Sequence, residues 1–525
     1  MSHLYNRLCA NYNWAMSLPK QTKITTILAK ASRLLAEQGH QGYIVGGFIR
    51  DWLLGRQTDD IDIAVDGNAL DIAREVAEGL GGKFVLLDEI NSIARVVVIE
   101  KERQEGPPQN RRFCGAEWHL DFSSFSGSIE SDLARRDFTI NAMAVKLGQL
   151  GGVDIALKLI DPFSGKEDLR NRAVRAINER IFEADAARLL RAVRLAAELD
   201  FTIEPKTESL IRRYSQSIVK VSGERVREEL LRLLNLPRAA HYLRYLDDLG
   251  LLLALVPELA ESKGVEQPTT HFWNVFEHSL QTVAAVEFLI RENDWEYGSK
   301  DILSTAPWAD AIDRQLSAEV SKGSNHKTLL KLAALFHDIA KPKTKFVDDA
   351  GRAHFYGHTK EGAAITAAIL DRLRFSHKEI NLVKSLVYYH LRPVQMSNSR
   401  ELPTRRAIYR YFRDTGDAGI DILFLALADY LATYGPLVDM GEWKEHCQLI
   451  NYILVEHEKQ QANVLPVKLI DGHDVVNIFG LPPGPLVGEL LALVREAQAS
   501  GELTAKEEAL ALVRQELNKR QLEVS

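Results

Sequence analysis

The segment GGFIRDWLLGRQTDDIDIAV, residues 46–65, constrains the fold of this chain more than any other. The apolar run YIV before Gly46 and Gly47 predicts a short buried strand that stops at paired glycines. FIRDWLLG then predicts a helix, and DDIDIAV predicts a second strand. Asp60 and Asp62 alternate along that strand, so both carboxylates are expected to point to the same face. The chain should therefore build a small α/β unit that presents two aspartates side by side.

The surrounding sequence extends this unit into a mixed domain that reaches about residue 160. Apolar spacing predicts a helix over 22–40 and another over 65–80, while KFVLLD and ARVVVIE predict strands. The polar, proline-containing stretch 101–114 is expected to be a loop.

Beyond residue 168 strand patterns nearly vanish, and amphipathic helices are expected over 185–199, over 224–236 and from residue 270 onward. The polar stretch 293–325 is either an insertion or an ordered loop and helix element. The predicted fold class is α+β, with a mixed α/β head around a small sheet, a helical neck, an all-α domain and a helical tail. The expected division is an N-terminal extension over 1–24, the head over 25–175, the neck over 176–262, the all-α domain over 263–440 and the tail over 441–525.

Composition excludes several classes of protein. A chain of 525 residues suggests three or four domains, and its net charge of −7 gives no support to a general nucleic-acid coat. The three cysteines form no CxxC pair, which fits a reducing cytosol. No apolar run approaches the roughly 20 residues of a membrane span, and the amino terminus lacks a secretory signal. We expect a cytoplasmic protein with no membrane contact, and no protein partner is indicated.

The first candidate site is built from glycines and aspartates. Gly46 and Gly47 allow close approach of a ligand, and N–H groups at the following helix suit a triphosphate. Asp60 and Asp62 offer the hard oxygen ligands that Mg²⁺ prefers. Asp121, on the predicted strand WHLDFSSF, can supply the third carboxylate of a two-metal site that activates a 3′-hydroxyl. The alternatives are an ordinary turn and a solvated strand face.

A second set of candidate residues lies in DLARRDFTINAMAV, which predicts a helix over 132–145. Arg136 can pair with a phosphate or a carboxylate, and Asp137 and Asn141 can hydrogen-bond a ribose. The alternative is an ordinary charged helix.

A third set lies in IFEADAARLLRAVRLAAELDF. Asp185 and Arg188 are three residues apart on one expected helical face, which Arg191 and Arg194 continue. A carboxylate beside a guanidinium presents an acceptor next to two donors, a template for the Watson–Crick edge of a base. The alternative is a simple ion pair on the surface.

These ordered motifs, together with IDPFSGKEDLR, resemble the class II tRNA nucleotidyltransferases and their poly(A) polymerase relatives over about residues 25–250. The resemblance implies transfer from CTP, ATP or both to the 3′ end of tRNA, without a nucleic-acid template. It implies Mg²⁺ on Asp60 and Asp62, ribose contacts from Arg136, Asp137 and Asn141, and base selection by Asp185 and Arg188. The nucleotide-binding set expected on these grounds is Gly46, Gly47, Arg50, Arg136, Asp137, Asn141, Asp185, Arg188 and Arg191.

Two departures from the family pattern bear on the product. The base-reading motif usually begins Glu-Asp, but here Ala184 precedes Asp185 and the glutamate is Glu183. Only SSFSGSIES separates Asp121 from Asp132, and such a short segment resembles enzymes that add C without the final A. Addition of CCA, of CC or of A alone therefore stays open. A poly(A) polymerase would usually carry a strongly basic tail, which is absent from the last 25 residues.

Positive charge gathers in residues 188–232 and can follow an RNA backbone. The alternative is a solvated helix face with glutamate partners. The residues expected to contact RNA are Arg194, Arg212, Arg213, Arg225 and Arg227.

The all-α region carries a second constellation, in VFEHSLQTV, LFHDIAKPK, FYGHTKEG, VYYHLRP and ALADYLA. Adjacent His337 and Asp338, with His278 and Asp429 from distant helices, can complete a mixed nitrogen and oxygen site for Mn, Fe, Ni, Co or Mg. His358 and His390 can extend it to a second ion, and Lys341 can hold a phosphate.

This pattern resembles the HD phosphohydrolase superfamily over about residues 270–435, which implies hydrolysis of 2′,3′-cyclic phosphates or phosphomonoesters. His271 and His354 are expected to be non-ligands. The sequence thus predicts an RNA-end enzyme with nucleotidyl transfer in the head and metal phosphohydrolysis behind it. The rivals are a phosphohydrolase whose head only binds RNA or nucleotide, a poly(A) polymerase and a non-catalytic RNA-binding protein.

Overall fold

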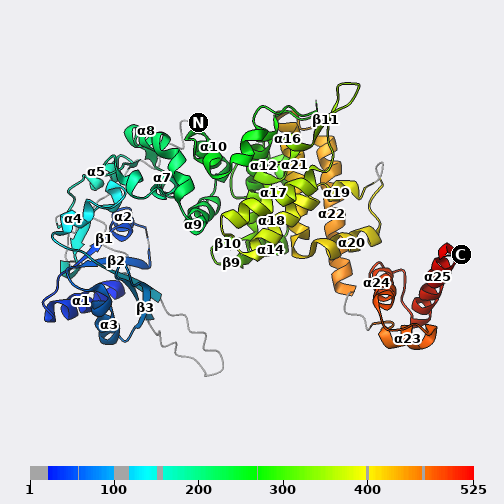
Figure 1. Ribbon diagram of the computed structural model, residues 1–525, viewed down its shortest axis with the longest axis horizontal. Coiled ribbons are helices and arrows are strands. Elements are labelled where there is room, and N and C mark those ends of the chain that lie inside the picture. The colour runs from blue at the N-terminus through cyan, green and yellow to red at the C-terminus, as the bar shows by residue number, and fades with distance from the viewer. Residues whose placement is uncertain are drawn as a thin grey trace. The chain divides into compact units, whose positions relative to one another are not determined.

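The computed structural model describes residues 22–56, 58–99, 117–149, 158–268, 270–397, 401–463 and 468–524 (Figure 1). Two predictions fall largely outside these residues. They are the loop over 101–114 and the N-terminal extension over 1–24. The chain divides after Ser217 into two compact units. This single division does not test the finer domain boundaries, and each unit is described by itself.

The first unit is built on a mixed sheet of six strands in the order β3-β4-β5-β2-β1-β6. β2 and β5 run parallel, and all the other neighbours are antiparallel. The strands are β1 (Gly42–Val45), β2 (Asp60–Val65), β3 (Lys83–Asp88), β4 (Ile93–Ile99), β5 (Glu117–Ser124) and β6 (Ala144–Lys146). The apolar residues of the central strands are buried, as Ile61, Ile63, Leu120 and Phe122 show.

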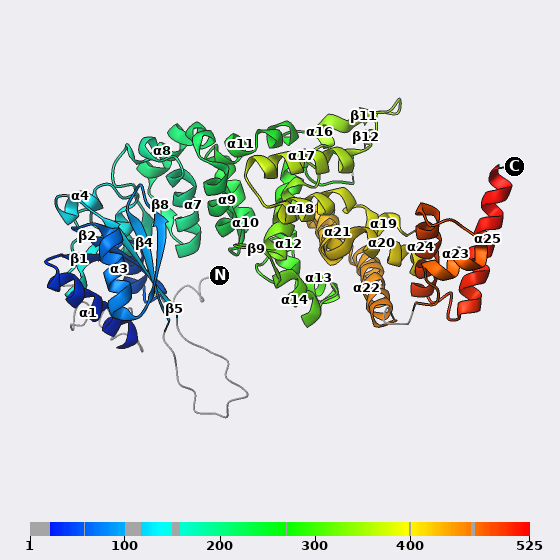
Figure 2. The same ribbon diagram turned by 60° about the horizontal axis from the view of Figure 1, so that its bottom comes forward.

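Helices α1 and α3 pack against each other beside this sheet (Figure 2). The helices of the unit are α1 (Thr22–Glu37), α2 (Gly47–Leu53), α3 (Ala69–Leu80), α4 (Ile129–Leu133), α5 (Gly165–Arg170), α6 (Ile181–Ala184), α7 (Arg188–Leu199) and α8 (Pro205–Tyr214). A short parallel pair, β7 (Ala173–Val174) with β8 (Thr202–Ile203), joins two of the loops.

The helix predicted over 65–80 begins later than expected. Val65 still belongs to β2, and its carbonyl accepts from Phe125 N at 2.9 Å. Asn68 then caps α3 by accepting from Leu70 N at 3.0 Å. The strand pairing therefore moves the start of the helix to Ala69.

The helix predicted over 132–145 is wrong. α4 ends at Leu133, a 3-10 turn covers Thr139–Asn141, and β6 pairs with β1. Asp137 Oδ1 accepts from Phe138 N at 2.8 Å, a local bond that competes with helix formation. Phe138, Ile140 and Met143 are buried although the segment is not a helix, so their helical spacing did not indicate the secondary structure.

The second unit is mainly helical, as predicted (Figure 1). α12 (Val275–Leu289), α15 (His326–Phe336), α18 (His377–Tyr389) and α21 (Gly419–Tyr434) pack together at its centre, and α17 (His358–Arg372) covers α18. Its other helices are α9 (Gly223–Leu234), α10 (Ala239–Asp248), α11 (Leu251–Leu255), α13 (Lys300–Thr305), α14 (Asp310–Ser317), α16 (Lys341–Thr344), α19 (Arg392–Gln395), α20 (Arg405–Thr415), α22 (Met440–Asn463), α23 (Gly472–Phe479), α24 (Pro485–Ala499) and α25 (Lys506–Val524).

Two short hairpins interrupt the helices. β9 (Glu319–Ser321) pairs with β10 (Ser324–Asn325), and β11 (Lys345–Val347) pairs with β12 (Ala353–Phe355). The first hairpin, with α13 and α14, shows that the stretch 293–325 is an ordered loop and helix element.

One helical run among the described residues, Arg405–Leu437, is long and apolar enough by composition to cross a membrane. Its apolar window is 61% buried inside the protein, and it contains α21, which packs on α12, α15 and α22. Burial of this kind is that of a core helix.

Candidate active sites

Asp62, Asp121 and Arg95 lie in one row across three strands of the head. Asp62 on β2 is the register partner of Asp121 on β5, which is the partner of Arg95 on β4. Arg95 donates two hydrogen bonds to Asp121, from Nε to Oδ1 and from Nη2 to Oδ2, both at 2.7 Å. Asp121 thus has the position expected of the third carboxylate, but a guanidinium already pairs with both of its oxygens. Its role as a metal ligand stays a prediction.

Asp60 and Asp62 share a face of β2, as the alternation predicted, but their surroundings differ. Both side chains lie on the exposed face of β2, but partial desolvation raises the pKa of Asp62, with Arg136 opposing the rise. Gly46 has φ of 73°, and a Cβ there would stand 2.8 Å from Asp62 Oδ2. The glycine therefore makes room for the Asp62 carboxylate. Two carboxylates on the exposed face of one strand suit a cation that bridges protein and substrate.

His119 completes this face and was missed by the sequence reasoning. Its Nδ1 lies 3.0 Å from Asp60 Oδ1, and its Nε2 lies 3.1 Å from Glu117 Oε1. The hydrogen bond with Glu117 is the largest cause that raises the pKa of His119. His119 is the register partner of Asp60, so the strand alternation that placed Asp121 could also have found it.

Two of the predicted ribose-contact residues, Asp137 and Asn141, belong to a chain of hydrogen bonds that also includes Arg50. Arg50 pairs with Asp51 and donates to Asn141 Oδ1 at 2.9 Å. Asn141 donates to Asp137 Oδ1 at 3.1 Å, and Asp137 Oδ2 accepts from Arg191 at 3.2 Å. The structure thus brings together Arg50, Asp137, Asn141 and Arg191, which are far apart in the sequence. Such a network fixes each rotamer.

Arg136 lies apart from that chain and close to the aspartates. It pairs with Asp132, whose Oδ2 accepts from Nη2 at 3.3 Å. A Cβ at Gly46 would stand 2.9 Å from Arg136 Nη1. Arg136 therefore contributes positive charge at the aspartate face. Of its two predicted partners, a phosphate or a carboxylate, the structure shows the carboxylate of Asp132, and a phosphate contact stays a prediction.

Asp185 and Arg188 do not lie on one helical face, which corrects the expectation. Asp185 has an extended conformation before α7, and its Oδ1 accepts from Ala187 N at 3.1 Å. Arg188 Nε lies 3.9 Å from Asp185 Oδ2, and its Nη2 donates to the Arg135 carbonyl at 2.9 Å. The two side chains are still neighbours. Backbone carbonyls orient Arg188 in place of a preceding glutamate, while Glu183 accepts from Tyr214 Oη.

The predicted RNA-contact arginines have different surroundings. Arg194 is only 8% exposed and pairs with Glu198, so it does not lie on an exposed basic track. Arg212 is exposed and pairs with Glu208 at 2.7 Å. Arg227 donates to the Arg374 carbonyl at 3.2 Å. Arg213 and Arg225 are exposed. The RNA contacts of this set stay predictions.

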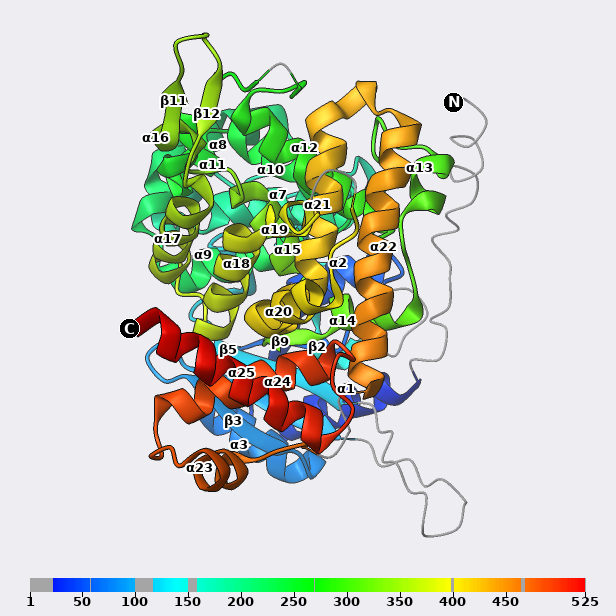
Figure 3. The same cartoon turned by 90° about the vertical axis from the view of Figure 1, so that its right-hand side faces the viewer.

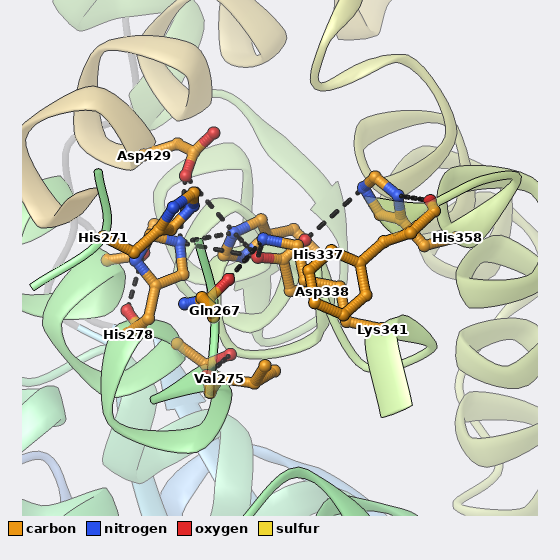
Figure 4. A network of polar contacts seen from close by, with 12 residues as sticks. Gln267, His271, Val275, His278, His337, Asp338, Lys341, His358 and Asp429 are labelled. Atoms are coloured by element: carbon orange, nitrogen blue, oxygen red, sulfur yellow. Dashed lines mark hydrogen bonds and ion pairs between the residues drawn. The ribbon is translucent and has the colours of Figure 1, made fainter. Parts of the chain in front are cut away.

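The second unit gathers two groups of potential metal ligands (Figure 4). The first consists of His278, His337 and Asp429, where His278 Nε2 lies 2.9 Å from Asp429 Oδ1 and 3.2 Å from His337 Nε2. The second consists of Asp338, His358 and His390. These are all six residues predicted, now in two clusters, and they are the only such groups found among the described residues.

Asp338 links the two groups. Its Oδ2 lies 3.2 Å from His337 Nε2, and its Oδ1 lies 3.5 Å from His358 Nε2. Asp338 Oδ2 is paired with Lys341 Nζ at 2.6 Å, whereas Asp338 Oδ1 and His358 Nε2 are buried without a hydrogen-bond partner. Buried polar atoms without such partners are costly, which fits residues that would hold a cation.

Three histidines are oriented by backbone carbonyls three residues earlier. The Nδ1 atoms of His337, His358 and His390 lie 2.7–2.8 Å from the carbonyls of Ala334, Phe355 and Val387. Each ring therefore turns Nε2 inward, toward the clusters. Desolvation lowers the pKa of His337, but the carboxylates of Asp338 and Asp429 outweigh it and raise that pKa to about 10. Burial lowers the pKa of His390 to about 4, so the ring is neutral, the form that binds metals. These residues fit a pair of divalent cations.

Lys341 and His271 border the clusters. Lys341 Nζ lies 2.6 Å from Asp338 Oδ2 and donates to Gln267 Oε1 at 2.6 Å, so it balances the charge of Asp338 (Figure 4). A phosphate contact by Lys341 stays a prediction. His271 packs edge-on against His278 with ring centres 5.5 Å apart and belongs to neither group. Its non-ligand role stays a prediction.

Three family models match the chain in order. They are the poly A polymerase head domain over residues 42–175, the probable RNA and SrmB-binding site of polymerase A over 200–263, and the HD domain over 275–434. The match to the HD domain spans all six ligands.

Curated relatives match along nearly the whole chain. The A-adding tRNA nucleotidyltransferase of Deinococcus radiodurans is 33% identical, covering 90% of this chain and 94% of the relative. The CC-adding tRNA nucleotidyltransferase of Thermus thermophilus is 34% identical, covering 89% and 92%. A CC-adding tRNA nucleotidyltransferase of Geobacter sulfurreducens is 30% identical, covering 90% and 92%.

Solved structures agree in fold. A CCA-adding enzyme in its apo form I superposes with a TM-score of 0.61 at 22% identity, covering 94% of both chains. The Thermotoga maritima CCA-adding enzyme, complexed with tRNA-CCA, superposes with a TM-score of 0.57 at 22% identity, covering 94% of this chain and 96% of the other. At this identity the likeness shows the fold alone.

Proposed function

This chain belongs to the tRNA nucleotidyltransferase family and is a nucleotidyltransferase, and from that premise we propose that it extends the 3′ end of tRNA with nucleotides from CTP, ATP or both. The observation that carries the proposal is the pair Asp60 and Asp62 on one face of β2, beside the close approach of Gly46. No template strand is needed if the protein itself reads the base.

Asp60 and Asp62 would hold the divalent cation, for which Mg²⁺ is the proposed identity. When bound, such a cation supplies Lewis-acid stabilisation of the charge that develops on the phosphates. Arg136 adds positive charge on the same side, beside Gly46. The chain Arg50–Asn141–Asp137–Arg191 would hold the sugar of the incoming nucleotide in one orientation.

Asp185 and Arg188 would select the base. Arg188 is held by the carbonyls of Arg135 and Ile181, which leaves its position independent of the glutamate that the family usually carries. An acceptor and donors fixed side by side match the edge of cytosine or adenine.

For the product, we propose addition of CC without the terminal A. The relatives that align over the whole chain include both A-adding and CC-adding enzymes at nearly equal identity. The short connection between β5 and α4, residues 125–128, favours the CC-adding type, because enzymes that switch to A usually have a longer segment there.

A second function is supported by the six clustered ligands of the HD domain. We propose a metal-dependent phosphohydrolase that acts on 2′,3′-cyclic phosphates or phosphomonoesters at RNA ends. Divalent transition metals or Mg²⁺ would be held by His278, His337 and Asp429 and by Asp338, His358 and His390. Bound cations of this kind lower the pKa of water and so supply a nucleophile near neutral pH.

Nucleotide transfer is tested by offering labelled CTP or ATP to tRNAs that end at the discriminator base, at C and at CC. Extension that stops at CC supports the proposal, extension only of the CC substrate indicates an A-adding enzyme, and long A tails indicate a polymerase. Asp60→Asn and Asp62→Asn should each abolish incorporation. Asp66→Asn is the control, because Asp66 is exposed just beyond the end of β2. Full incorporation by Asp60→Asn would overturn the central proposal.

Hydrolysis is tested separately with RNA fragments that end in a 2′,3′-cyclic phosphate or a 3′-phosphate. Asp338→Asn should abolish hydrolysis and leave incorporation intact, whereas Asp60→Asn should do the reverse. Asp371→Asn, on the exposed side of α17, is the matched control. Hydrolysis that persists in Asp338→Asn would show that the activity belongs to another site.

A further inference from the structure

The hairpin β11–β12 presents aromatic rings to solvent, although it lies in the chain between two metal-ligand segments, Asp338 and His358. Phe346 is 56% exposed and Tyr356 is 71% exposed. Figure 3 shows the hairpin projecting from the helices of its unit, at the side where α16 and α17 lie. Exposed rings gathered on one projecting element mark an interaction surface.

Three rings form a ladder on one face of the hairpin. Phe346 on β11 is the register partner of His354 on β12, and their ring centres are 6.4 Å apart. Tyr356 stacks on His354 with ring centres 5.3 Å apart and planes within 7° of parallel. Cross-strand partners and residues two apart share a face of a hairpin, so the rings form one continuous surface.

The hairpin is coupled to the metal clusters through its other face. The carbonyl of Phe355, the last residue of β12, orients His358 through a contact of 2.7 Å with Nδ1. The ring of Phe355 lies under Lys341 Nζ at 5.5 Å, and Lys341 pairs with Asp338 (Figure 4). The aromatic ladder therefore begins two residues before a metal ligand, and its position is fixed relative to the clusters.

The charge of the hairpin favours an anionic ligand. Residues 341–356 carry four cationic and two anionic side chains, of which Lys341 pairs with buried Asp338 and Arg352 pairs with Asp348. The other charged side chains are Lys343, Lys345 and Asp349, so the cations outnumber the anion by two to one. Lys343 and Lys345 are exposed at the base of β11. Cations interleaved with exposed rings are the pattern that binds single-stranded nucleic acid, because bases stack on rings while cations contact phosphates.

We propose that the β11–β12 hairpin is a stacking platform for unpaired nucleotides of an RNA end, which it holds so that the terminal phosphate reaches the HD clusters. This inference rests on the proposed phosphohydrolase function for the choice of ligand. The chemical class of ligand is a single strand of RNA; a protein docking on the same rings is the outcome that would overturn the proposal.

The binding test uses the full chain and a hexanucleotide RNA that carries 2-aminopurine near its end and a 3′-deoxynucleotide, which the head cannot extend. Stacking should quench 2-aminopurine fluorescence. Tyr356→Ala with Phe346→Ala should remove the quenching and weaken binding about tenfold, since each stacked base contributes measurably to affinity. Tyr356→Phe should retain both, because the ring remains. Phe272→Ala is the control, since Phe272 is another exposed ring, 47% accessible, outside the hairpin.

Hydrolysis gives a second readout that a merely structural role would not reproduce. The double variant should raise KM for an RNA end about tenfold, with kcat and the hydrolysis of bis(p-nitrophenyl) phosphate unchanged. If the wild-type chain hydrolyses nothing but the double variant still loses quenching, the phosphohydrolase proposal falls and the platform stands. If quenching and binding are the same in wild type and double variant, the platform is refuted whatever the hydrolysis.

Discussion

Arg95 and Asp121 face each other in register across β4 and β5 and are joined by two hydrogen bonds of 2.7 Å. The same guanidinium reaches toward Asp60, with Nη2 3.6 Å from Oδ1. The aspartate face of the head is therefore organised by a cation that the protein itself supplies. A bidentate pair fixes the plane of the carboxylate as well as its position.

This pair predicts a positioning role for Arg95. Arg95→Ala should lower kcat for nucleotide incorporation about 10- to 100-fold, as loss of a residue that orients active-site carboxylates commonly does. Arg95→Lys should recover only part of the rate, because an ammonium cannot bind both oxygens in the same plane. Steady-state incorporation of CTP measures both. Arg74→Ala, at an exposed arginine that pairs with Asp71 on α3, is the control. Wild-type kcat in Arg95→Ala would show that Asp121 needs no such partner.

Gly46 predicts a severe local effect from one methyl group. A Cβ there would stand 2.8 Å from Asp62 Oδ2 and 2.9 Å from Arg136 Nη1, at a φ of 73° that L-residues rarely adopt. Gly46→Ala should abolish measurable incorporation. Gly39→Ala is a matched control, because Gly39 has φ of 80° with nothing within 4 Å of its Cβ position. Both variants carry backbone strain of about 1 kcal/mol, measured by thermal unfolding, but only one should lose activity.

Much of the head could be predicted because its chemistry follows local patterns. The alternation of Asp60 and Asp62 placed both on one face, and the paired glycines marked the end of β1 correctly. The error at 132–145 arose because helical spacing and burial between strands leave the same apolar pattern. There, pairing of Ala144 and Val145 with β1 decides the structure, and such pairing is set by residues a hundred positions away.

Arg95 gains its role from the neighbouring strand, and no periodicity within one strand reveals a cross-strand partner. His119 lies two residues before Asp121 on β5, so alternation places both on one face, but its contact with Asp60 depends on strand pairing. In the HD domain the six candidate ligands could be named from the sequence, and the structure brings them together. Their division into two clusters linked by Asp338 depends on how α12, α15, α17, α18 and α21 pack, which spacing alone does not determine.

That division predicts the metal content of variants. His358→Ala should lower the bound divalent metal from about two ions per chain to about one, and His278→Ala should do the same for the other cluster. Asp338→Asn should lower both, because Asp338 lies within 3.5 Å of ligands in each cluster. Elemental analysis after dialysis measures the stoichiometry. His446→Gln, at a half-buried histidine outside both clusters, should keep the wild-type content. Equal metal loss in every histidine variant would contradict two separate clusters.

A buried histidine and aspartate in the second unit should make the stability of the fold depend on pH. His326 Nδ1 lies 2.6 Å from Asp421 Oδ2 in the buried core, with Asp417 nearby. Burial opposes the charge on His326, but the hydrogen bond with Asp421 outweighs it and raises the pKa of the imidazole above its ordinary value. A raised folded-state pKa stabilises the fold below the unfolded value of about 6.5, and this stabilisation is lost as pH rises through the folded pKa.

Asp421→Asn should therefore lower the free energy of unfolding most at about pH 6 and least at about pH 9, with a loss of about 1–3 kcal/mol at the lower pH. Without the Asp421 carboxylate, burial lowers the pKa of His326 and only Asp417 opposes it, so the sign of the pH dependence reverses. Chemical denaturation across this range, with metal content held constant, measures the difference between wild type and variant. His377→Gln is the matched control, because His377 also begins a helix, α18, but is exposed. A difference between wild type and Asp421→Asn that does not change with pH would show that the pair is neutral.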